Sequence, residues 1–179
     1  MSRIFLSLTL ALVVTGCGLS SQFRAAAEPP GGARARVRVR TQDSLVRIVP
    51  GKDCLDLSTE GSGVVLGAGL GSHGFAGRSL GMPGGKQGDR KSAEFYVEAG
   101  KPLVLDFQRG NEAGALGCEL SFAFTPEANR DYEVSATLLK LDKTYCVADV
   151  RALGLEEKVR ITPAKSCEAA SAPAAASAQ

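Results

Sequence analysis

The chain has 179 residues, of which 44% are hydrophobic and 22% are charged, and its formal net charge at neutral pH is +2. This composition is typical of one globular domain. The chain lacks the strong positive charge that would favour nucleic acid as a partner. No second long apolar run follows the first 16 residues, so we expect no transmembrane helix in the rest of the chain.

The N-terminus has the parts of a lipoprotein signal sequence. Arg3 supplies positive charge, and an apolar run extends from Ile4 to Val14. The signal sequence then ends with Val14-Thr15-Gly16-Cys17. The apolar run is too short for a permanent membrane span of about 20 residues, but it suits a secretory signal. The last four residues resemble a bacterial lipobox, in which an aliphatic residue and two small residues precede the cysteine that becomes lipidated.

The resemblance to bacterial lipoproteins implies that residues 1–16 are a signal peptide. It implies a thioether-linked diacylglycerol and an N-linked acyl chain such as palmitate on Cys17, and two or more acyl chains anchor a protein stably. Gly18 stands where an aspartate would suggest retention in the inner membrane. The resemblance therefore predicts an outer-membrane anchor with the protein facing the periplasm. The alternative is a signal peptide cut elsewhere, with Cys17 as an ordinary thiol.

The remainder of the chain divides into a tether, a domain and a tail. Residues 17–34 are mostly small or polar and include Pro and Gly, a composition typical of a flexible linker. The domain is expected to cover residues 35–167. Residues 168–179 are of low complexity and supply no core side chains, so we expect them to be disordered.

Alternating arginines mark the beginning of the domain. In a β-strand they share one face, opposite a face of small apolar residues. One interpretation is a cationic strip that binds lipid headgroups, lipopolysaccharide phosphates or cell-wall carboxylates. The other, which we favour, is the solvated outer face of a first strand, whose charge discourages edge-to-edge pairing and is offset by nearby acidic residues. The arginines concerned are Arg34, Arg36, Arg38 and Arg40.

A Gly-rich segment covers residues 61–91 and contains a G-x-G-x-x-G at Gly69, Gly71 and Gly74. A dinucleotide site needs such a loop to open a helix, because the helix N-terminus holds the pyrophosphate. Gly and Pro are so frequent after Gly74 that we expect no helix there. The sequence therefore predicts neither a nucleotide partner nor a cofactor.

The basic residues near the end of this segment leave two interpretations open. The segment is either a structural or mobile surface loop, which we favour, or a binding loop whose cations contact a partner. The candidate contact residues are Arg78, Lys86, Arg90 and Lys91.

Alternation of apolar and polar residues predicts β-strands in the rest of the domain. Short linkers lead us to expect one antiparallel hairpin from residues 93–98 and 103–107, and another from residues 118–125 and 132–138. About eight short strands without helical crossovers predict an all-β fold, a Greek-key-like antiparallel β-sandwich. The other candidate strands are Arg36–Arg40, Leu45–Val49, Thr144–Val150 and Lys158–Thr162.

The turn before Tyr132 agrees with this architecture. Tyr132-x-Val134 after a turn resembles a feature of many Greek-key sandwich modules, in which a tyrosine beside a turn starts a core strand. The resemblance concerns the fold and implies no function.

Four cysteines remain once Cys17 is assigned to lipid, and an even number in an oxidising compartment predicts two disulfides. We predict the pairs Cys54–Cys118 and Cys146–Cys167. A metal site is disfavoured, because the sequence has no C-x-x-C spacing and only one histidine, His73.

The sequence shows no catalytic constellation. His73 has no identifiable nucleophile beside it, and the acidic residues of the strands are interpreted as outward-facing polar positions instead of a catalytic pair. We therefore expect a non-catalytic binding or envelope-assembly component, with an envelope protein or the cell wall as its partner. The alternative is an inhibitor or ligand sensor that uses the loop at residues 61–91. The acidic residues are Glu94, Glu98, Asp106, Glu112 and Glu119.

The lipid anchor is testable at Cys17. The Cys17→Ala variant is expected to lose metabolic labelling by acyl chains and to leave the detergent phase on phase partitioning, because the acceptor thiol is gone. A variant that stays labelled and membrane-bound would show that the anchor is elsewhere.

Overall fold

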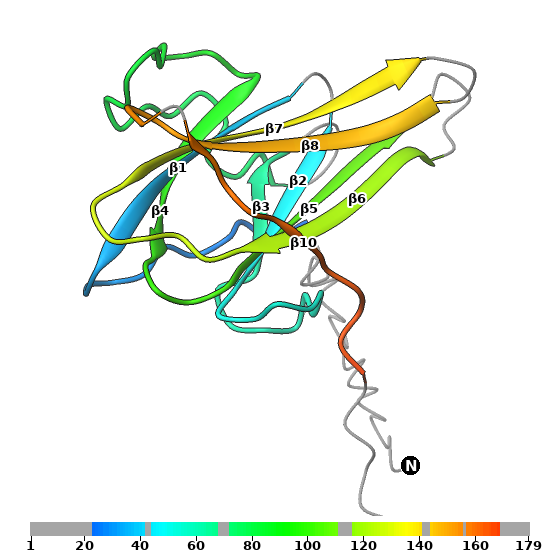
Figure 1. Ribbon diagram of the computed structural model, residues 1–179, viewed down its shortest axis with the longest axis horizontal. Helices are drawn as coiled ribbons and strands as arrows, with labels where there is room; N and C mark the ends of the chain where they lie inside the picture. The colour runs from blue at the N-terminus through cyan, green and yellow to red at the C-terminus, as the bar shows by residue number, and fades with distance from the viewer. Residues whose placement is uncertain are drawn as a thin grey trace, which may run out of the picture.

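The computed structural model describes residues 23–41, 44–67, 72–110, 116–140, 144–155 and 157–168. These residues form two five-stranded sheets that pack as a β-sandwich, without an α-helix (Figure 1). The predicted all-β sandwich is confirmed. Over the same residues, no helix is found that is long and apolar enough to cross a membrane.

Each sheet combines strands from distant parts of the chain. The first contains, in spatial order, β4 (Ser92–Glu98), β1 (Arg34–Arg40), β7 (Asp131–Lys140), β8 (Thr144–Ala152) and β9 (Glu157–Lys158). The second contains β10 (Thr162–Pro163), β6 (Leu116–Phe124), β5 (Leu103–Gly110), β2 (Leu45–Pro50) and β3 (Gly63–Leu66). Neighbouring strands run antiparallel except for β1 and β7, which run parallel.

Both predicted hairpins are wrong. β4 pairs with β1, whereas β5 pairs with β2 and β6, so residues 99–102 cross from one sheet to the other. β6 and β7 likewise belong to different sheets. Alternation identifies the face of a strand that meets the core, but both sheets need the same pattern. A short linker therefore serves equally well as a hairpin turn or as an arch between sheets.

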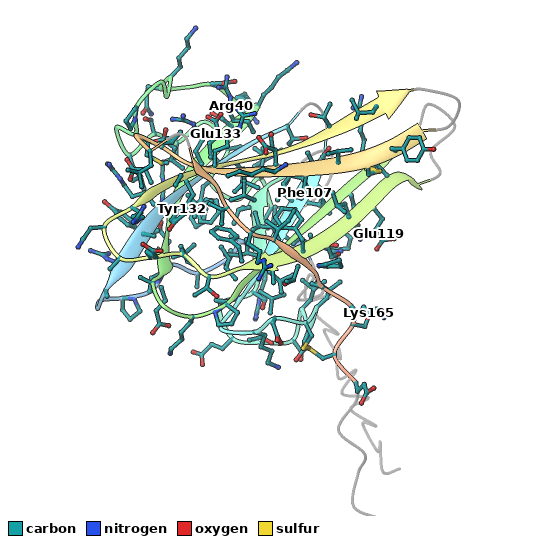
Figure 2. All side chains as sticks on the ribbon, in the orientation of Figure 1. Arg40, Phe107, Glu119, Tyr132, Glu133 and Lys165 are labelled. Carbon is teal, nitrogen blue, oxygen red and sulfur yellow. A yellow bond between two sulfur atoms is a disulfide. The ribbon has the colours of Figure 1, made fainter. Side chains whose placement is uncertain are left out.

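The core fills the space between the two sheets. Phe95 of β4, together with Phe107 and Phe122 of the second sheet, is among the largest fully buried side chains. Figure 2 shows Phe107 in this space. Tyr132 is buried at the start of β7, and its hydroxyl accepts a hydrogen bond from the Glu127 amide at 2.9 Å. This bond holds the linker between β6 and β7 against the strand that follows it.

The predicted two disulfides are present, but the predicted pairing is wrong. Cys118 of β6 is bonded to Cys146 of β8, so this disulfide joins the two sheets. Cys54 is bonded to Cys167. The C-terminal segment folds back along the loop after β2, where the Leu55 amide donates to the Lys165 carbonyl at 2.8 Å. The error follows from the hairpin error, because the pairing depends on which strands face each other.

The described part of the predicted tether contacts the domain. Val64 in β3 donates its amide to the Arg24 carbonyl at 2.8 Å, and its carbonyl accepts from the Ala26 amide at 3.0 Å. Ala26 is buried in the main core cluster. The folded part of the chain therefore includes residues 24–28, ahead of the predicted boundary at residue 35, and covers the free edge of β3. Cys17 and residues 169–179 lie outside the described residues.

The disulfide between the sheets is expected to stabilise the sandwich. Replacing Cys118 and Cys146 together by serine should lower the free energy of unfolding by about 2–4 kcal/mol, because the unfolded chain is no longer restricted by the cross-link. Chemical denaturation of the oxidised proteins measures this difference. Peptide mapping without reduction should recover Cys118 joined to Cys146, and a peptide that joins Cys54 to Cys118 would contradict the fold.

Candidate functional site

The arginines of β1 form ion pairs across the first sheet. Arg36 makes a bidentate pair with Asp131, with both N–O distances at 2.7 Å. Arg38 lies 3.2 Å from Glu94 and 2.7 Å from Glu133. The register places Arg38 opposite Glu94 on β4 and opposite Glu133 on β7. Because β1 lies between these two strands, the favoured interpretation of a solvated, edge-protecting strand is wrong for Arg36 and Arg38.

Glu94 attaches the Gly-rich loop to the outer face of the first sheet. Its carboxylate accepts hydrogen bonds from the Leu80 and Met82 amides and from the Ser79 hydroxyl, and its side chain is 1% exposed. Burial raises the pKa of Glu94, but these hydrogen bonds together with that from Arg38 lower it by more, so the pKa lies below its ordinary value. Glu94 occupies the outward position of its strand that the alternation predicted, but the loop over it buries it instead of leaving it exposed to solvent.

The close approach of the loop also explains one of its glycines. A Cβ atom at Gly85 would overlap the Glu94 carboxylate, and the Arg38 guanidinium beside it donates to the Pro83 carbonyl at 2.8 Å. In its described residues, the loop is therefore a layer held on the sheet by a buried ion pair. Of the G-x-G-x-x-G motif, Gly69 and Gly71 lie outside the described residues, and Gly74 forms a β-bridge with Leu66.

Arg78, a predicted contact residue, is also engaged inside the domain. Its guanidinium forms an ion pair with Glu28 and donates to the Glu94 carbonyl at 2.8 Å. Glu28 accepts a further hydrogen bond from the Tyr96 amide at 2.6 Å. Burial raises the pKa of Glu28, and the bonds from Arg78 and Tyr96 lower it by more. Arg78 thus joins the N-terminal segment, the loop and β4.

Three cations come together at one end of the sandwich, around a hollow of about 370 Å³. Arg40 and Lys91 were both predicted as partner-binding residues, whereas Arg109 was missed. Arg40 ends β1, Lys91 precedes β4 and Arg109 is near the end of β5, so both sheets contribute. We call this group the cationic hollow, and its lining residues are Arg40, Thr41, Asp89, Lys91, Arg109, Ser135, Ala136 and Thr137.

The alternation of the strands explains why Thr41 and Arg109 lie here. Val37 and Val39 face the core, and Thr41 continues their side of the chain. Arg109 likewise continues the core-facing side that includes Leu105 and Phe107. Both residues occupy inward positions where the sheets end, so polar groups stand at the mouth of the space that apolar side chains fill elsewhere. An arginine at an inward position was the signal in the sequence that could have identified Arg109.

The charges of the hollow are only partly compensated. Among the described residues, three cations and Asp89 line it, which gives them together a formal charge of +2. Arg40 lies 3.6 Å from Glu133, and the two are labelled in Figure 2. The Glu133 carboxylate is closer to Arg38, at 2.7 Å. Within the described part of the chain, no acidic side chain lies within 4.0 Å of the charged groups of Lys91 or Arg109.

Thr41 adds an unsatisfied polar group to the same wall. The residue is 8% exposed, and its hydroxyl has no hydrogen-bond partner among the described residues. A buried hydroxyl without a partner costs about 1–3 kcal/mol. The Thr41 amide donates to the Lys91 carbonyl at 3.1 Å, which fixes the two residues relative to each other.

The remaining predicted residues do not join this group. Arg34 and Arg90 are exposed outside the hollow, and the Arg34 guanidinium lies 4.5 Å from the centre of the Tyr96 ring. His73 is exposed, and no group of three potential metal ligands is found in the described ranges.

Comparison with protein-family models and with curated proteins finds no match to this chain.

Removing the Glu94 charge is expected to release the loop. The Glu94→Gln variant should lower the free energy of unfolding by about 3 kcal/mol at neutral pH, because Arg38 loses a buried partner. It should also speed tryptic cleavage at Arg78, Lys86 and Arg90, which limited proteolysis measures. The matched control is Glu98→Gln in the same strand, where the exposed pair with Lys101 should contribute less than about 1 kcal/mol.

The effect of Glu94→Gln depends on pH in a direction that its pKa fixes. A carboxylate with a lowered pKa in the folded state stabilises the fold above its unfolded pKa, and this contribution is lost as pH falls through the folded pKa. The wild type should therefore lose stability below about pH 4.5, the ordinary pKa of the group. The difference from Glu94→Gln should narrow over the same range, and a constant difference would contradict the assignment.

Proposed function

We propose that the protein is a non-catalytic binding component of the bacterial cell envelope, anchored by lipid at Cys17 and facing the periplasm from the outer membrane. Its partner, an envelope protein or a cell-wall component, is bound at the cationic hollow. The observation that carries this proposal is the meeting of Arg40, Lys91 and Arg109 around one hollow, with two of them outside any ion pair among the described residues.

A binding role agrees with the way the buried carboxylates are used. Asp106 is fully buried, lies 2.6 Å from Arg47 and accepts a hydrogen bond from the Ser121 hydroxyl at 2.6 Å. Glu94 is similarly enclosed by Arg38 and loop amides. Both carboxylates therefore act as structural anions inside ion pairs. The enclosure of these carboxylates supports a binding role, in which the sandwich presents its surface to a partner.

The second candidate is a ligand sensor that uses the Gly-rich loop. Asp89 and Lys91, at the end of that loop, line the hollow, and this contact favours a ligand-binding version of the hypothesis. Insertion of the described part of the loop into another protein is disfavoured, because Glu94, Arg38 and Arg78 hold it against the first sheet.

Charge substitutions separate the hollow from the loop surface. The immobilised full chain with Arg109→Gln should recover about tenfold less of its partner from envelope extracts than the wild type, because a charge-assisted contact is lost. The double variant Lys86→Gln/Arg90→Gln removes two exposed cations outside the hollow and should recover as much as the wild type. Capture that depends on Lys86 and Arg90 but not on Arg109 would contradict binding at the hollow and favour the loop-mediated inhibitor.

A further inference from the structure

We infer that the cationic hollow binds a phosphate group, either of a lipid headgroup or of a soluble phosphate compound. The inference rests on the proposed binding role of the hollow and names the chemistry of what it recognises. It follows from the charge, the donor groups and the size of the site.

Charge and donor geometry favour phosphate over carboxylate. The lining side chains that the structure describes have a formal charge of +2, from three cations and one carboxylate. A phosphate monoester carries a charge of about −1.5 to −2 at neutral pH and offers three strong acceptor oxygens. A single carboxylate carries a smaller charge, about −1, and has two acceptor oxygens. The guanidinium groups of Arg40 and Arg109 are planar forks that bind phosphate oxygens in pairs, while Lys91 supplies a point charge.

Thr41 provides an independent indication of a ligand. Its hydroxyl is buried without a partner on the wall of the hollow, although buried hydroxyls are ordinarily hydrogen-bonded. A phosphate oxygen is an acceptor for this hydroxyl, and a rotation about χ1 changes its direction without moving the backbone. Binding would therefore satisfy a group that the fold leaves unsatisfied.

The size of the hollow also suits a phosphate compound. Its volume of about 370 Å³ exceeds that of a bare phosphate and is within the range of small-ligand pockets, which is about 300–1,000 Å³. The smaller space beside it is lined by Phe107, Arg109 and Cys118, so the inter-sheet disulfide supports the same wall.

Isothermal titration of the purified full chain in a non-ionic detergent tests the inference at constant ionic strength. The probes are inorganic phosphate, dihexanoyl phosphatidic acid as a short-chain lipid, and acetate as a carboxylate. Both phosphate probes are expected to bind more tightly than acetate. Equal affinity for the two phosphates identifies a soluble phosphate as a sufficient ligand, whereas tighter binding of the lipid by tenfold or more identifies a headgroup.

Three variants locate the binding. Arg109→Gln should weaken phosphate binding by roughly tenfold, the loss of one charge-assisted contact. Thr41→Val keeps the shape of the side chain and should weaken binding roughly threefold to tenfold without lowering the thermal midpoint, because it removes an unsatisfied hydroxyl. Lys101→Gln makes the same charge change as Arg109→Gln, in an exposed pair with Glu98 outside the hollow, and should bind as the wild type does.

Failure of the inference is distinguishable from failure of the proposed function. The inference is overturned if neither phosphate probe binds, if acetate binds equally well, or if Arg109→Gln binds phosphate like the wild type. In one outcome, neither phosphate probe binds while the Arg109→Gln variant still recovers less of the envelope partner than the wild type. In that case the hollow remains the binding site, and only the proposed class of ligand is wrong. Labelling of Cys17 depends on neither result.

Discussion

The buried ion pair between Arg38 and Glu94 is the interaction on which the first sheet and its outer layer depend. Taking two charges out of water is costly, and their attraction compensates only when further hydrogen bonds satisfy the remaining groups. Here the Glu94 carboxylate accepts hydrogen bonds from two loop amides and a hydroxyl. Arg38 forms an ion pair with Glu133 and donates a hydrogen bond to a loop carbonyl. The pair therefore requires β4, β1, β7 and the Gly-rich loop to assemble together.

The distribution of free charge over the surface follows from this arrangement. The pairing of β1 with two acid-bearing strands engages Arg36 and Arg38, so the alternating arginines do not present a continuous cationic strip. Arg40 lies at the end of the strand, and its guanidinium is 3.6 Å from Glu133. At this end of the sandwich, Arg40 meets Lys91 and Arg109 around one hollow.

The sequence predicted the parts of the fold that depend on local patterns. Alternation identified the main strands and the buried faces of Val37 and Val39, because strand periodicity is a property of neighbouring residues. It could not predict that Cys118 faces Cys146, since this contact depends on how the two sheets are stacked. Glu94 resembled any outward polar residue, and only the placement of the loop over it makes it a buried anion. Arg109 was missed because its strand was predicted to end at Phe107, before the inward pattern reaches the arginine.

Each of the two sheets carries a buried ion pair on its outer face. On the first, the Gly-rich loop covers Arg38 and Glu94. On the second, Arg47 and Asp106 form a pair that is 5% and 0% exposed, beside a small apolar cluster that includes Val104 and Ala164. The segment around Ala164 is held there by the disulfide between Cys54 and Cys167. A buried ion pair thus lies on the outer face of each sheet, and the N-terminal segment covers the edge of β3. At the end of the sandwich, inward positions carry Thr41 and Arg109 in place of apolar side chains, and packing of the core does not explain this composition. Recognition of an anionic group there gives those residues a physical reason.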